Sequence, residues 1–536
     1  MGFCSFWVTN WRAPGGWKDL LSIAVPLSMS MVSNGIQSFV DTLFLSTLNA
    51  NGAVSLASTT ISVLLALVVP TIEFSSTFIA QYIGANRKRE VGNVFWHAMY
   101  LSILLGIASA AGAPFIKYVF LLLNPGDEPQ PLRQKTEFAG TLLYGSVAIY
   151  IKMAFSAYFS GQGRAVVVLI LNAVSAAINV GFLALFVSVL HLDVTGAALA
   201  TVVSNIIVDV GFTVIAFKSR KEIRELGLAN MRFRPRVLWS LAKYGLSNGL
   251  QSCIEMVSAT YFQTLIGSIN YIFLDAFGIA LQTNNLLLLP VQGILLAIEV
   301  LSGRYLGARQ VGNVERAVRS GLFLGFCYVL IYGSIYLFAP NFFLWMFGRD
   351  PASDNGIMIR LSLYMCVAYS TCDVLNYVFS APCKASGDVY FTMVCSITYG
   401  VICYLVPPIL LKEVFLRGDR DPWHCWAFWL GPCMSIALQA TSLFLRYLEG
   451  TWRTRELLEG HDFLSELDAK KSAAEIRRRV ATEGLTEVGP DSSPLLDEQF
   501  ETATPVKPTS TSPPAEAMTV FSEPITVTPA KTRPAA

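Results

Sequence analysis

The chain has 536 residues, of which 53% are hydrophobic and 14% are charged, and its formal net charge is +2. Soluble globular proteins carry about 25% charged residues, so this composition excludes an ordinary soluble fold. The balanced charge also excludes the strongly basic face that nucleic-acid binding requires. We therefore expect a multi-pass protein of the lipid bilayer with no nucleic-acid partner.

Apolar runs long enough to cross a bilayer recur along the chain, separated by short polar or Gly/Pro breaks. A spanning helix needs about 20 apolar residues, and backbone groups in lipid must be paired within the helix. Twelve spans are predicted, at residues 20–47, 52–80, 94–123, 138–160, 165–190, 196–217, 238–266, 273–303, 318–346, 357–382, 389–411 and 424–448. Pro70 and Pro290 interrupt two of them.

Basic residues concentrate in the loops that follow the even-numbered spans. Three of these loops contain Arg87–Arg89, the seven bases of residues 218–236, and Arg304 with Arg309, Arg316 and Arg319. The loops after odd-numbered spans contain fewer bases and more compensating acids. The positive-inside rule therefore predicts that both termini are cytoplasmic, in a plasma membrane or cell inner membrane.

These patterns divide the chain into six predicted parts. Two lobes of six spans each occupy residues 18–217 and 237–448, and a basic cytoplasmic loop, 218–236, joins them. Residues 1–17 form a cytoplasmic N-terminal segment, and residues 449–484 are predicted to form a charged cytoplasmic helix. Residues 485–536 are rich in Pro, Ser and Thr, so we expect a disordered tail.

The two lobes share three short motifs in the same order. SNGIQSFVDT (33–42) matches SNGLQSCIEM (247–256), IAQYIGANR (79–87) matches LSGRYLGARQ (301–310), and FSAYFSGQGR (155–164) matches FSAPCKASGD (379–388). Because six spans is an even number, both lobes insert with the same sense. The predicted fold is an all-α polytopic membrane protein of twelve transmembrane helices, in two six-helix lobes related by a pseudo-twofold axis along the membrane normal.

Several polar residues are predicted to lie deep within spans, where an ionisable group is a functional candidate by default. Interhelical hydrogen bonds, worth about 0.6–2 kcal/mol each, are the alternative explanation for the amides. Carboxylates are poorly suited to such purely structural hydrogen bonds, because burying a charge costs several kcal/mol. The candidates are Asn34, Gln37 and Asp41 in the first span; Asn172 and Asn179 in the fifth; Asn248, Gln251 and Glu255 in the seventh; Asp373, Asn376 and Tyr377 in the tenth; and, less firmly placed, Glu73, Lys152, Asp209, Gln282 and Glu299.

At these residues the sequence resembles the multidrug and toxic compound extrusion (MATE) family, in particular its NorM-like branch. The resemblance covers most of residues 18–448 and lies in SFVDTLFLSTL, QYIGANRKREVG, RYLGARQVGNVERA, SGQGR followed by Asn179, TGAALATVVSN, GLQSCIEM and STCDVLNYVFSA. It implies that Pro26 forms a bend and that Asp41 takes up H⁺ or contacts the drug. It further implies a cation site at Glu255 and Asp373, often Na⁺-linked in that branch.

The sequence departs from the family pattern at three positions. Ser175 lies in the region of the fifth span where a second, closer Asn is expected. Arg304 stands where the family has a small or amide residue, as at Gln81 in the first half. Lys152, inside the fourth span, has no role in the family pattern and either pairs with an acid or lies at a cytoplasmic boundary.

The resemblance implies a secondary antiporter that exports amphipathic organic cations in exchange for H⁺ or Na⁺ by alternating access. We expect a non-enzymatic monomer with no cofactor besides the coupling ion, and no metal site from the scattered His and Cys residues. The cleft would be lined by the polar candidates and by aromatic walls such as Phe155, Tyr158 and Phe262. Two alternatives stay open: a lipid-linked precursor flippase of the same superfamily, and a membrane-embedded transferase.

Overall fold

The computed structural model describes residues 11, 13–47, 51–123, 128–269, 271–414 and 425–453, and all regular structure in these ranges is helical. The predicted tail over 485–536 and nearly all of the predicted charged helix over 449–484 lie outside the described residues. The same holds for residues 1–10 of the predicted N-terminal segment.

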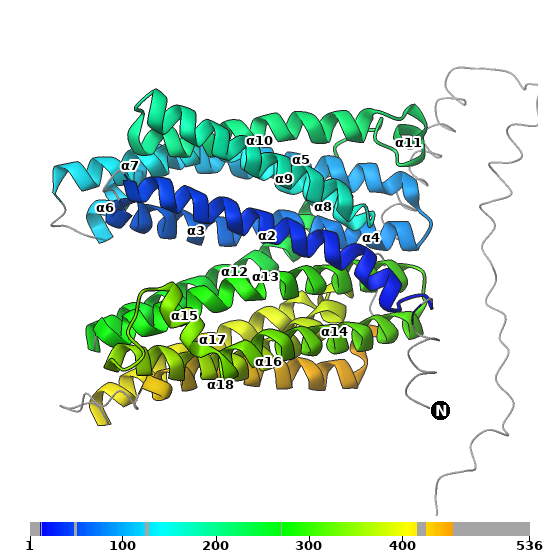
Figure 1. The fold of residues 1–536 in the computed structure, drawn as a ribbon. Coiled ribbons are helices and arrows are strands. Elements are labelled where there is room, and N and C mark those ends of the chain that lie inside the picture. The colour runs from blue at the N-terminus through cyan, green and yellow to red at the C-terminus, as the bar shows by residue number, and fades with distance from the viewer. Residues whose placement is uncertain are drawn as a thin grey trace, which may run out of the picture. The chain divides into compact units, whose positions relative to one another are not determined.

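The first six spans form the N-lobe, drawn in blue to teal in Figure 1. Proline, glycine or small residues break several of them into two helical pieces, and the fourth span is bent by 49° between its pieces. The helices are α2 (Trp17–Thr47), α3 (Asn51–Glu73), α4 (Ser75–Gly84), α5 (Lys88–Gly112), α6 (Ile116–Leu123), α7 (Pro129–Tyr144), α8 (Ser146–Gly161), α9 (Ala165–Leu183) with its extension η2 (Ala184–Val189), and α10 (Asp193–Phe217).

The last six spans form the C-lobe, drawn in green to orange in Figure 1. The short helix α11 (Arg220–Glu225) lies in the basic loop that precedes them. The C-lobe helices are α12 (Pro235–Ile269), α13 (Tyr271–Gly307), α14 (Val311–Phe338), α15 (Pro340–Met346), α16 (Asp354–Ala385), α17 (Val389–Val414) and α18 (Cys425–Glu449).

The helices agree with the twelve predicted spans. Among the described residues, nine helices are long and apolar enough to cross a membrane, and the bent pair α7–α8 makes ten. The described apolar part of α17, Val389–Tyr404, is shorter. The remaining span, α12, has 35 residues and several polar positions, including Asn248, Gln251 and Glu255.

The backbone repeats the motifs that the two lobes share in sequence. Asn86 and Arg309 both adopt left-handed conformations, with φ of 59° and 57°, in the turns after the second and eighth spans. Gly163 and Gly387, in the turns after the fourth and tenth spans, have φ of 76° and 84°. Left-handed backbone is rare for residues other than glycine, so its occurrence at matched turns supports a true internal repeat.

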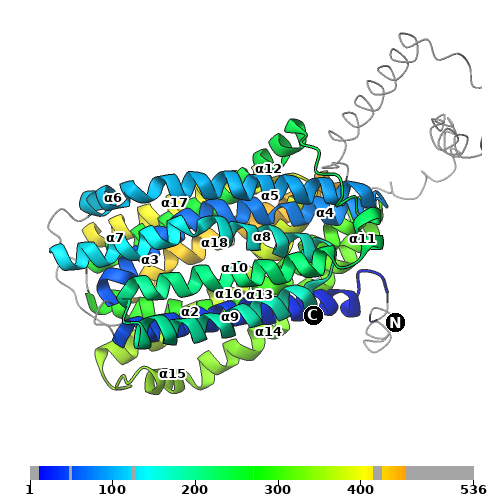
Figure 2. The same ribbon diagram turned by 90° about the horizontal axis from the view of Figure 1, so that it is seen from above.

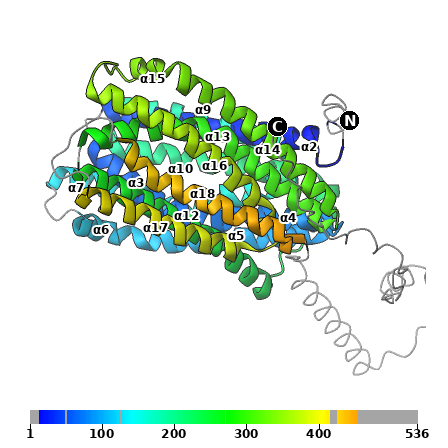
Figure 3. The ribbon, with the colours of Figure 1, turned by 90° about the horizontal axis from the view of Figure 1, so that it is seen from below.

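The lobes exchange contacts through their first and second spans. In the N-lobe, α2 packs against α9 and also against α13 of the C-lobe, and α12 in turn packs against α17 and against α3 of the N-lobe. Each lobe's first helix thus contacts the second span of the other lobe, as a pseudo-twofold axis requires. Figure 2 looks onto the N-lobe and Figure 3 onto the C-lobe.

We call the end of the helices formed by the turns at 84–88, 161–165, 217–235, 307–311 and 385–389 the basic end. It lies to the right in Figure 1, where α4 and α11 are labelled. The opposite end, near α6 and α15, pairs its bases with acids, as in Arg349–Asp275 at 2.8 Å and Arg133–Glu137 at 2.6 Å.

Candidate functional site

In the N-lobe, Asp41 lies in a cluster of amide and hydroxyl groups. Asn179 of α9 is fully buried, and its amide satisfies its neighbours when the nitrogen faces Asp41, to which it then donates at 2.9 Å. The Asn179 oxygen then accepts from the Gln37 amide at 3.2 Å and from the Thr201 hydroxyl at 3.3 Å. Asn179 therefore donates directly to the half-buried Asp41 carboxylate, while Gln37 of α2 and Thr201 of α10 bond to Asn179 and hold its amide in place.

A second polar contact between α2 and α9 lies nearer the basic end. The Asn172 amide donates to the Ser30 hydroxyl at 2.6 Å, and both side chains are buried. Asn172 and Asn179 are seven residues apart, so they lie on the same face of α9 and meet the polar stripe of α2. The structure thus joins Gln37 and Asp41 to Asn179, and Ser30 to Asn172, along the shared helix faces that the spacing predicts.

Lys152 is buried inside the N-lobe and not exposed at a boundary. Its ammonium donates to the Ser175 hydroxyl at 3.4 Å and interacts electrostatically with Asp209 of α10. The first of the two alternatives for Lys152, pairing with an acid, is therefore the one the structure favours. Ser175, where a second Asn was expected, serves as an acceptor for this lysine.

In the C-lobe, two carboxylates from different helices lie close together. Glu255 of α12 accepts a hydrogen bond from Gln251 at 3.2 Å. Asp373 of α16 is 2% exposed, lies close enough to Glu255 for the two charges to interact, and has Asn376 as a hydrogen-bonding neighbour. No Lys or Arg among the described residues forms an ion pair with either acid.

Three tyrosines surround this pair of carboxylates. Tyr369 and Tyr377 of α16 and Tyr404 of α17 each interact with both Glu255 and Asp373. Tyr404 was not among the predicted site residues, and neither was Thr201 in the N-lobe. Thr201 could have been found from the polar stripe that it forms with Asn205 and Asp209 in the sixth span, whereas only the packing of α17 identifies Tyr404.

Other predicted residues lie outside these clusters. Gln282 is exposed, and neither it nor the half-buried Asn34 makes a side-chain hydrogen bond to a described residue. The prediction that aromatics line a cleft is wrong for three of them: Phe155 and Tyr158 belong to the buried core of the N-lobe and Phe262 to that of the C-lobe. Helical spacing could not distinguish a lobe-facing from a cleft-facing ring.

Asn248 forms a hydrogen bond between the two lobes. Its amide donates to the Pro70 carbonyl of α3 at 3.2 Å. On the other side of the interface, the Ser28 hydroxyl of α2 donates to the Pro290 carbonyl of α13 at 2.8 Å, two residues after Pro26. The two prolines interrupt the second span of each lobe, and each has its carbonyl bonded by the first helix of the other lobe.

The lobes are joined most closely at the basic end, by a pair of matched hydrogen bonds. Gln81 donates to the Ala385 carbonyl, and Arg304 donates to the Gln162 carbonyl at 2.8 Å. Gln81 and Arg304 occupy equivalent positions of the repeat, whereas the acceptor Ala385 is one residue before Ser386, the position equivalent to Gln162, so the pseudo-twofold axis relates the two bonds to within one residue. The arginine that departs from the family pattern thus replaces an amide donor with a charged one.

Glycines allow this close approach. Gly84 faces the carbonyl of Arg304, Gly307 faces the carbonyl of Gln81, and a Cβ at either glycine would overlap that oxygen. Nearby, Thr77 of α4 donates to Glu299 of α13 at 2.7 Å, and Glu73 is close enough to interact with Glu299. The less firmly placed Glu73 and Glu299 therefore lie at the interface between the lobes.

An apolar cavity of about 660 Å³ lies beside the interface. It is lined by α2 and α9 of the N-lobe and by α13 and α14 of the C-lobe, with Ser28 and Pro290 among its lining residues. Exposed side chains such as Met29 and Ile331 border it, so it opens sideways from the helix bundle.

The MatE family profile matches the chain twice, over residues 26–185 and 247–408, once in each lobe. The chain belongs to the MatE family. Family membership confirms the resemblance inferred from the motifs and makes the protein a membrane transporter and not an enzyme.

Relatives cover nearly the whole membrane part of this MatE protein. The probable multidrug resistance protein NorM of Thermotoga maritima is 22% identical over 451 residues, which are 82% of this chain and 94% of that protein. The multidrug and toxin extrusion protein 2 of Oryctolagus cuniculus is 23% identical, over 82% of this chain and 72% of its own length.

Solved structures share the fold. An outward-facing multidrug resistance MATE family transporter superposes with a TM-score of 0.72 at 19% identity, over 84% of this chain and 99% of its own. A transporter of the MOP superfamily from Pyrococcus furiosus, described as having a binding pocket of reversed polarity, superposes with a TM-score of 0.74 at 20% identity, over the same shares. The twelve-helix, two-lobe MATE architecture predicted from the sequence is therefore confirmed.

Proposed function

We propose that this MatE protein exports amphipathic organic cations in exchange for H⁺ or Na⁺ moving inward. The observation that carries the proposal is that each lobe encloses its own carboxylate cluster, Asp41 in one and Glu255 with Asp373 in the other. The multidrug resistance proteins and the toxin extrusion protein among its relatives support a drug-like substrate.

The two clusters suit different coupling ions. A buried Asp373 beside a half-buried Glu255, with no base paired to either, favours a positive partner, because charge taken out of water must be compensated. Glu255, Asp373 and the surrounding tyrosine hydroxyls provide oxygen atoms of the kind that Na⁺ binds, so this pair is the proposed cation site. Asp41 already has neutral donors around it and needs only a proton to become uncharged.

Alternating access follows from where the lobes are joined. The positive-inside rule assigns the basic end, and with it both termini, to the cytoplasm of a plasma or cell inner membrane. The matched bonds of Gln81 and Arg304 then close the cytoplasmic side, which corresponds to an outward-facing state. Inward opening would break these bonds while the lobes rock about the contacts of Ser28 and Asn248. All these groups belong to one chain, so a monomer suffices.

The charges favour this function over a lipid-linked precursor flippase. Such a flippase would need cationic groups facing its pyrophosphate substrate, whereas Lys152, a buried base in the middle of the N-lobe, faces Ser175 and Asp209. A membrane-embedded transferase is inconsistent with membership of a transporter family.

Transport by reconstituted protein tests the proposal. Uptake of a fluorescent organic cation into vesicles containing inside-out protein is measured under a pH gradient alone and under a Na⁺ gradient alone. We expect Asp41→Asn to abolish pH-driven uptake, and Glu255→Gln or Asp373→Asn to abolish Na⁺-driven uptake.

The matched control is Asp354→Asn, which removes an exposed carboxylate from the opposite end of the same helix as Asp373. It should leave both activities unchanged. Normal uptake by all three site variants at equal reconstitution would rule out the carboxylate mechanism.

A further inference from the structure

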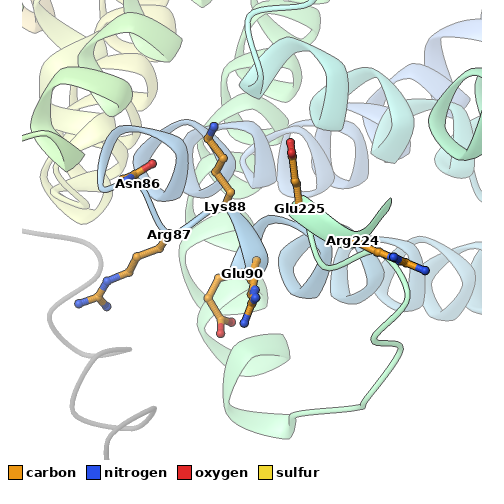
Figure 4. Close-up of a pocket in the computed structure, with 7 residues that line it drawn as sticks. Asn86, Arg87, Lys88, Glu90, Arg224 and Glu225 are labelled. Atoms are coloured by element: carbon orange, nitrogen blue, oxygen red, sulfur yellow. The ribbon is translucent and has the colours of Figure 1, made fainter. Parts of the chain in front are cut away.

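A groove of about 700 Å³ lies on the surface of the N-lobe at the basic end (Figure 4). Two segments far apart in the chain line it: the turn into α5, residues 86–90, and the end of α11, residues 224–225. Its lining contains four bases, Arg87, Lys88, Arg89 and Arg224, and two acids, Glu90 and Glu225. The transport mechanism proposed above makes no use of this surface.

The two acids of the groove are already neutralised by bases outside it. Arg234 forms an ion pair with Glu90 at 3.2 Å, and Lys221 forms one with Glu225 at 3.7 Å. Lys88, Arg89 and Arg224 are exposed, and within the described part of the chain they form no ion pair. The groove therefore presents an excess of positive charge to its surroundings.

The C-lobe does not repeat this groove, because Gln310, Val311 and Gly312 occupy the positions equivalent to Arg87, Lys88 and Arg89. Three other bases at the basic end of the C-lobe form ion pairs. There, Arg446 pairs with Asp388 at 2.8 Å, Arg453 with Glu315 at 2.7 Å, and Arg319 with the same glutamate at 3.8 Å. The basic groove is thus a property of one lobe and does not follow from the internal repeat.

The fold holds the two segments of the groove in a defined position. Gly92 of α5 donates its backbone N–H to the Leu226 carbonyl at 2.7 Å, and the Trp96 indole donates to the Leu228 carbonyl at 2.8 Å. Further along the loop, the backbone N–H of Arg234 donates to His97 at 2.8 Å. These bonds fix α11 beside α5, so the bases of the two segments face solvent from one continuous surface.

We propose that this groove binds the phosphate headgroups of anionic lipids in the adjacent leaflet. Lys and Arg form charge-assisted hydrogen bonds to phosphate, and each base near an anionic membrane surface contributes about 1 kcal/mol. In Figure 4, the side chains of Arg87, Lys88 and Arg224, which line the groove, point in different directions. This arrangement suits several headgroups in a membrane surface better than one enclosed phosphate ion.

The chain itself contains another acidic candidate for the groove. Residues 482–506 include six acids (Glu483, Glu487, Asp491, Asp497, Glu498 and Glu501) and no Lys or Arg. The groove's position where the spans reach the membrane surface favours the lipid, which is present there at high concentration. The experiment below therefore includes a shortened chain that removes this segment.

Lipid retention by the purified full-length protein tests the proposal. Detergent-solubilised protein is titrated with phosphatidylserine or phosphatidylcholine, and bound lipid is counted by native mass spectrometry. We expect retention of phosphatidylserine over phosphatidylcholine, and an apparent affinity at least about tenfold lower in Lys88→Gln/Arg89→Gln/Arg224→Gln, since each charge is worth about a fivefold factor. Arg224→Gln alone, the milder variant, should lower it about fivefold.

The matched control, Lys218→Gln/Arg232→Gln/Arg236→Gln, removes three exposed bases from the same loop outside the groove. It should retain phosphatidylserine nearly as well as the wild type. The proposal would be overturned if both triple variants lost phosphatidylserine affinity equally, or if the groove variant lost none.

Two further arms separate the sources of negative charge. Competition by soluble glycerophosphoserine at equal concentration would assign the groove to free phosphate compounds. A chain ending at residue 481 should bind phosphatidylserine as the full chain does. If shortening the chain raised the apparent affinity for phosphatidylserine tenfold, the acidic segment would be shown to occupy the groove, and the lipid assignment would be overturned. Uptake in phosphatidylcholine vesicles should be unchanged by the groove variant, because the groove lies outside the transport clusters.

Discussion

In the N-lobe, Asp41 is surrounded by amide and hydroxyl groups, whereas in the C-lobe Glu255 lies near a second carboxylate, that of Asp373. The N-lobe also contains a buried base, Lys152, which interacts electrostatically with Asp209, while no described base forms an ion pair with Glu255 or Asp373. The same stripe of Asn, Gln and acid on the first helix of each lobe thus meets different partners. An internal repeat conserves the scaffold and leaves the electrostatics of each lobe free to differ.

The lobes are most alike where they meet. At the basic end, the equivalent residues Gln81 and Arg304 each donate to a carbonyl of the other lobe, and Gly84 and Gly307 allow matched close approaches. Symmetry is retained there because each lobe is the other's packing surface, so a change on one side must be accommodated by both. The carboxylate clusters lie within single lobes and are under no such constraint.

The largest effect is expected from breaking the charge balance that only the N-lobe has. Lys152→Met would leave Asp209 without the base that interacts with it electrostatically, and leaving a buried polar group uncompensated costs about 1–3 kcal/mol, and more when the group is charged. We expect a marked fall in unfolding temperature, largely restored in Lys152→Met/Asp209→Asn. Thermal unfolding in detergent measures both.

Lys243→Met is the control, since Lys243 is exposed and contacts only aromatic rings among the described residues. It should change stability by less than about 1 kcal/mol. If the unfolding temperature of the double variant falls as far as that of Lys152→Met, Lys152 is needed for packing and not for its charge.

An intermediate effect is expected at the symmetric contact. Gly84→Ala and Gly307→Ala each place a Cβ against the facing carbonyl oxygen. Overpacking costs about 1–3 kcal/mol, which corresponds to a shift of about 5- to 150-fold away from the closed basic end. Spin labels at positions 86 and 309, on the two exposed turns, would report an increased distance in both variants.

Gly112→Ala serves as the control, because no atom lies within 4 Å of the added methyl group. The two interface variants should behave alike. A large increase in the spin-label distance for one glycine variant and none for the other would contradict the pseudo-twofold relation at this contact.

The smallest effect is expected from the matched glutamines. Gln37 donates to Asn179 at 3.2 Å and Gln251 donates to Glu255 at 3.2 Å, and one such bond contributes about 0.5–1.5 kcal/mol. If the lobes use different ions, Gln37→Leu should lower pH-driven uptake about fivefold and spare Na⁺-driven uptake. Gln251→Leu should do the reverse.

Gln282→Leu, which alters an exposed amide without a hydrogen bond to a described residue, should affect neither activity. Equal losses under both gradients in Gln37→Leu and Gln251→Leu would mean that the two clusters act as one coupled site.

Much of the candidate site could be predicted from helical spacing. Residues at intervals of three, four and seven share a helix face, which is why Gln37 and Asp41 meet Asn179 while Ser30 meets Asn172. The spacing did not indicate that Gln282 makes no hydrogen bond to a described residue, that Asn248 bonds the other lobe, or that Phe155, Tyr158 and Phe262 pack inside the lobes. One helix's periodicity defines its faces, but the neighbouring helix decides what each face contacts.

Composition, apolar runs and the repeated motifs determined the membrane class, the twelve spans and the two equivalent lobes. These features follow from local chemistry, because each span must satisfy its own backbone in lipid and each half must bury the same pattern. The tertiary structure decided which acids become neighbours, which base is balanced and where the lobes close. Those outcomes depend on contacts between helices far apart in the chain, such as α2 with α9 at Ser30 and Asn172, or α4 with α13 at Gly84 and Arg304. Nothing within either segment alone specifies them.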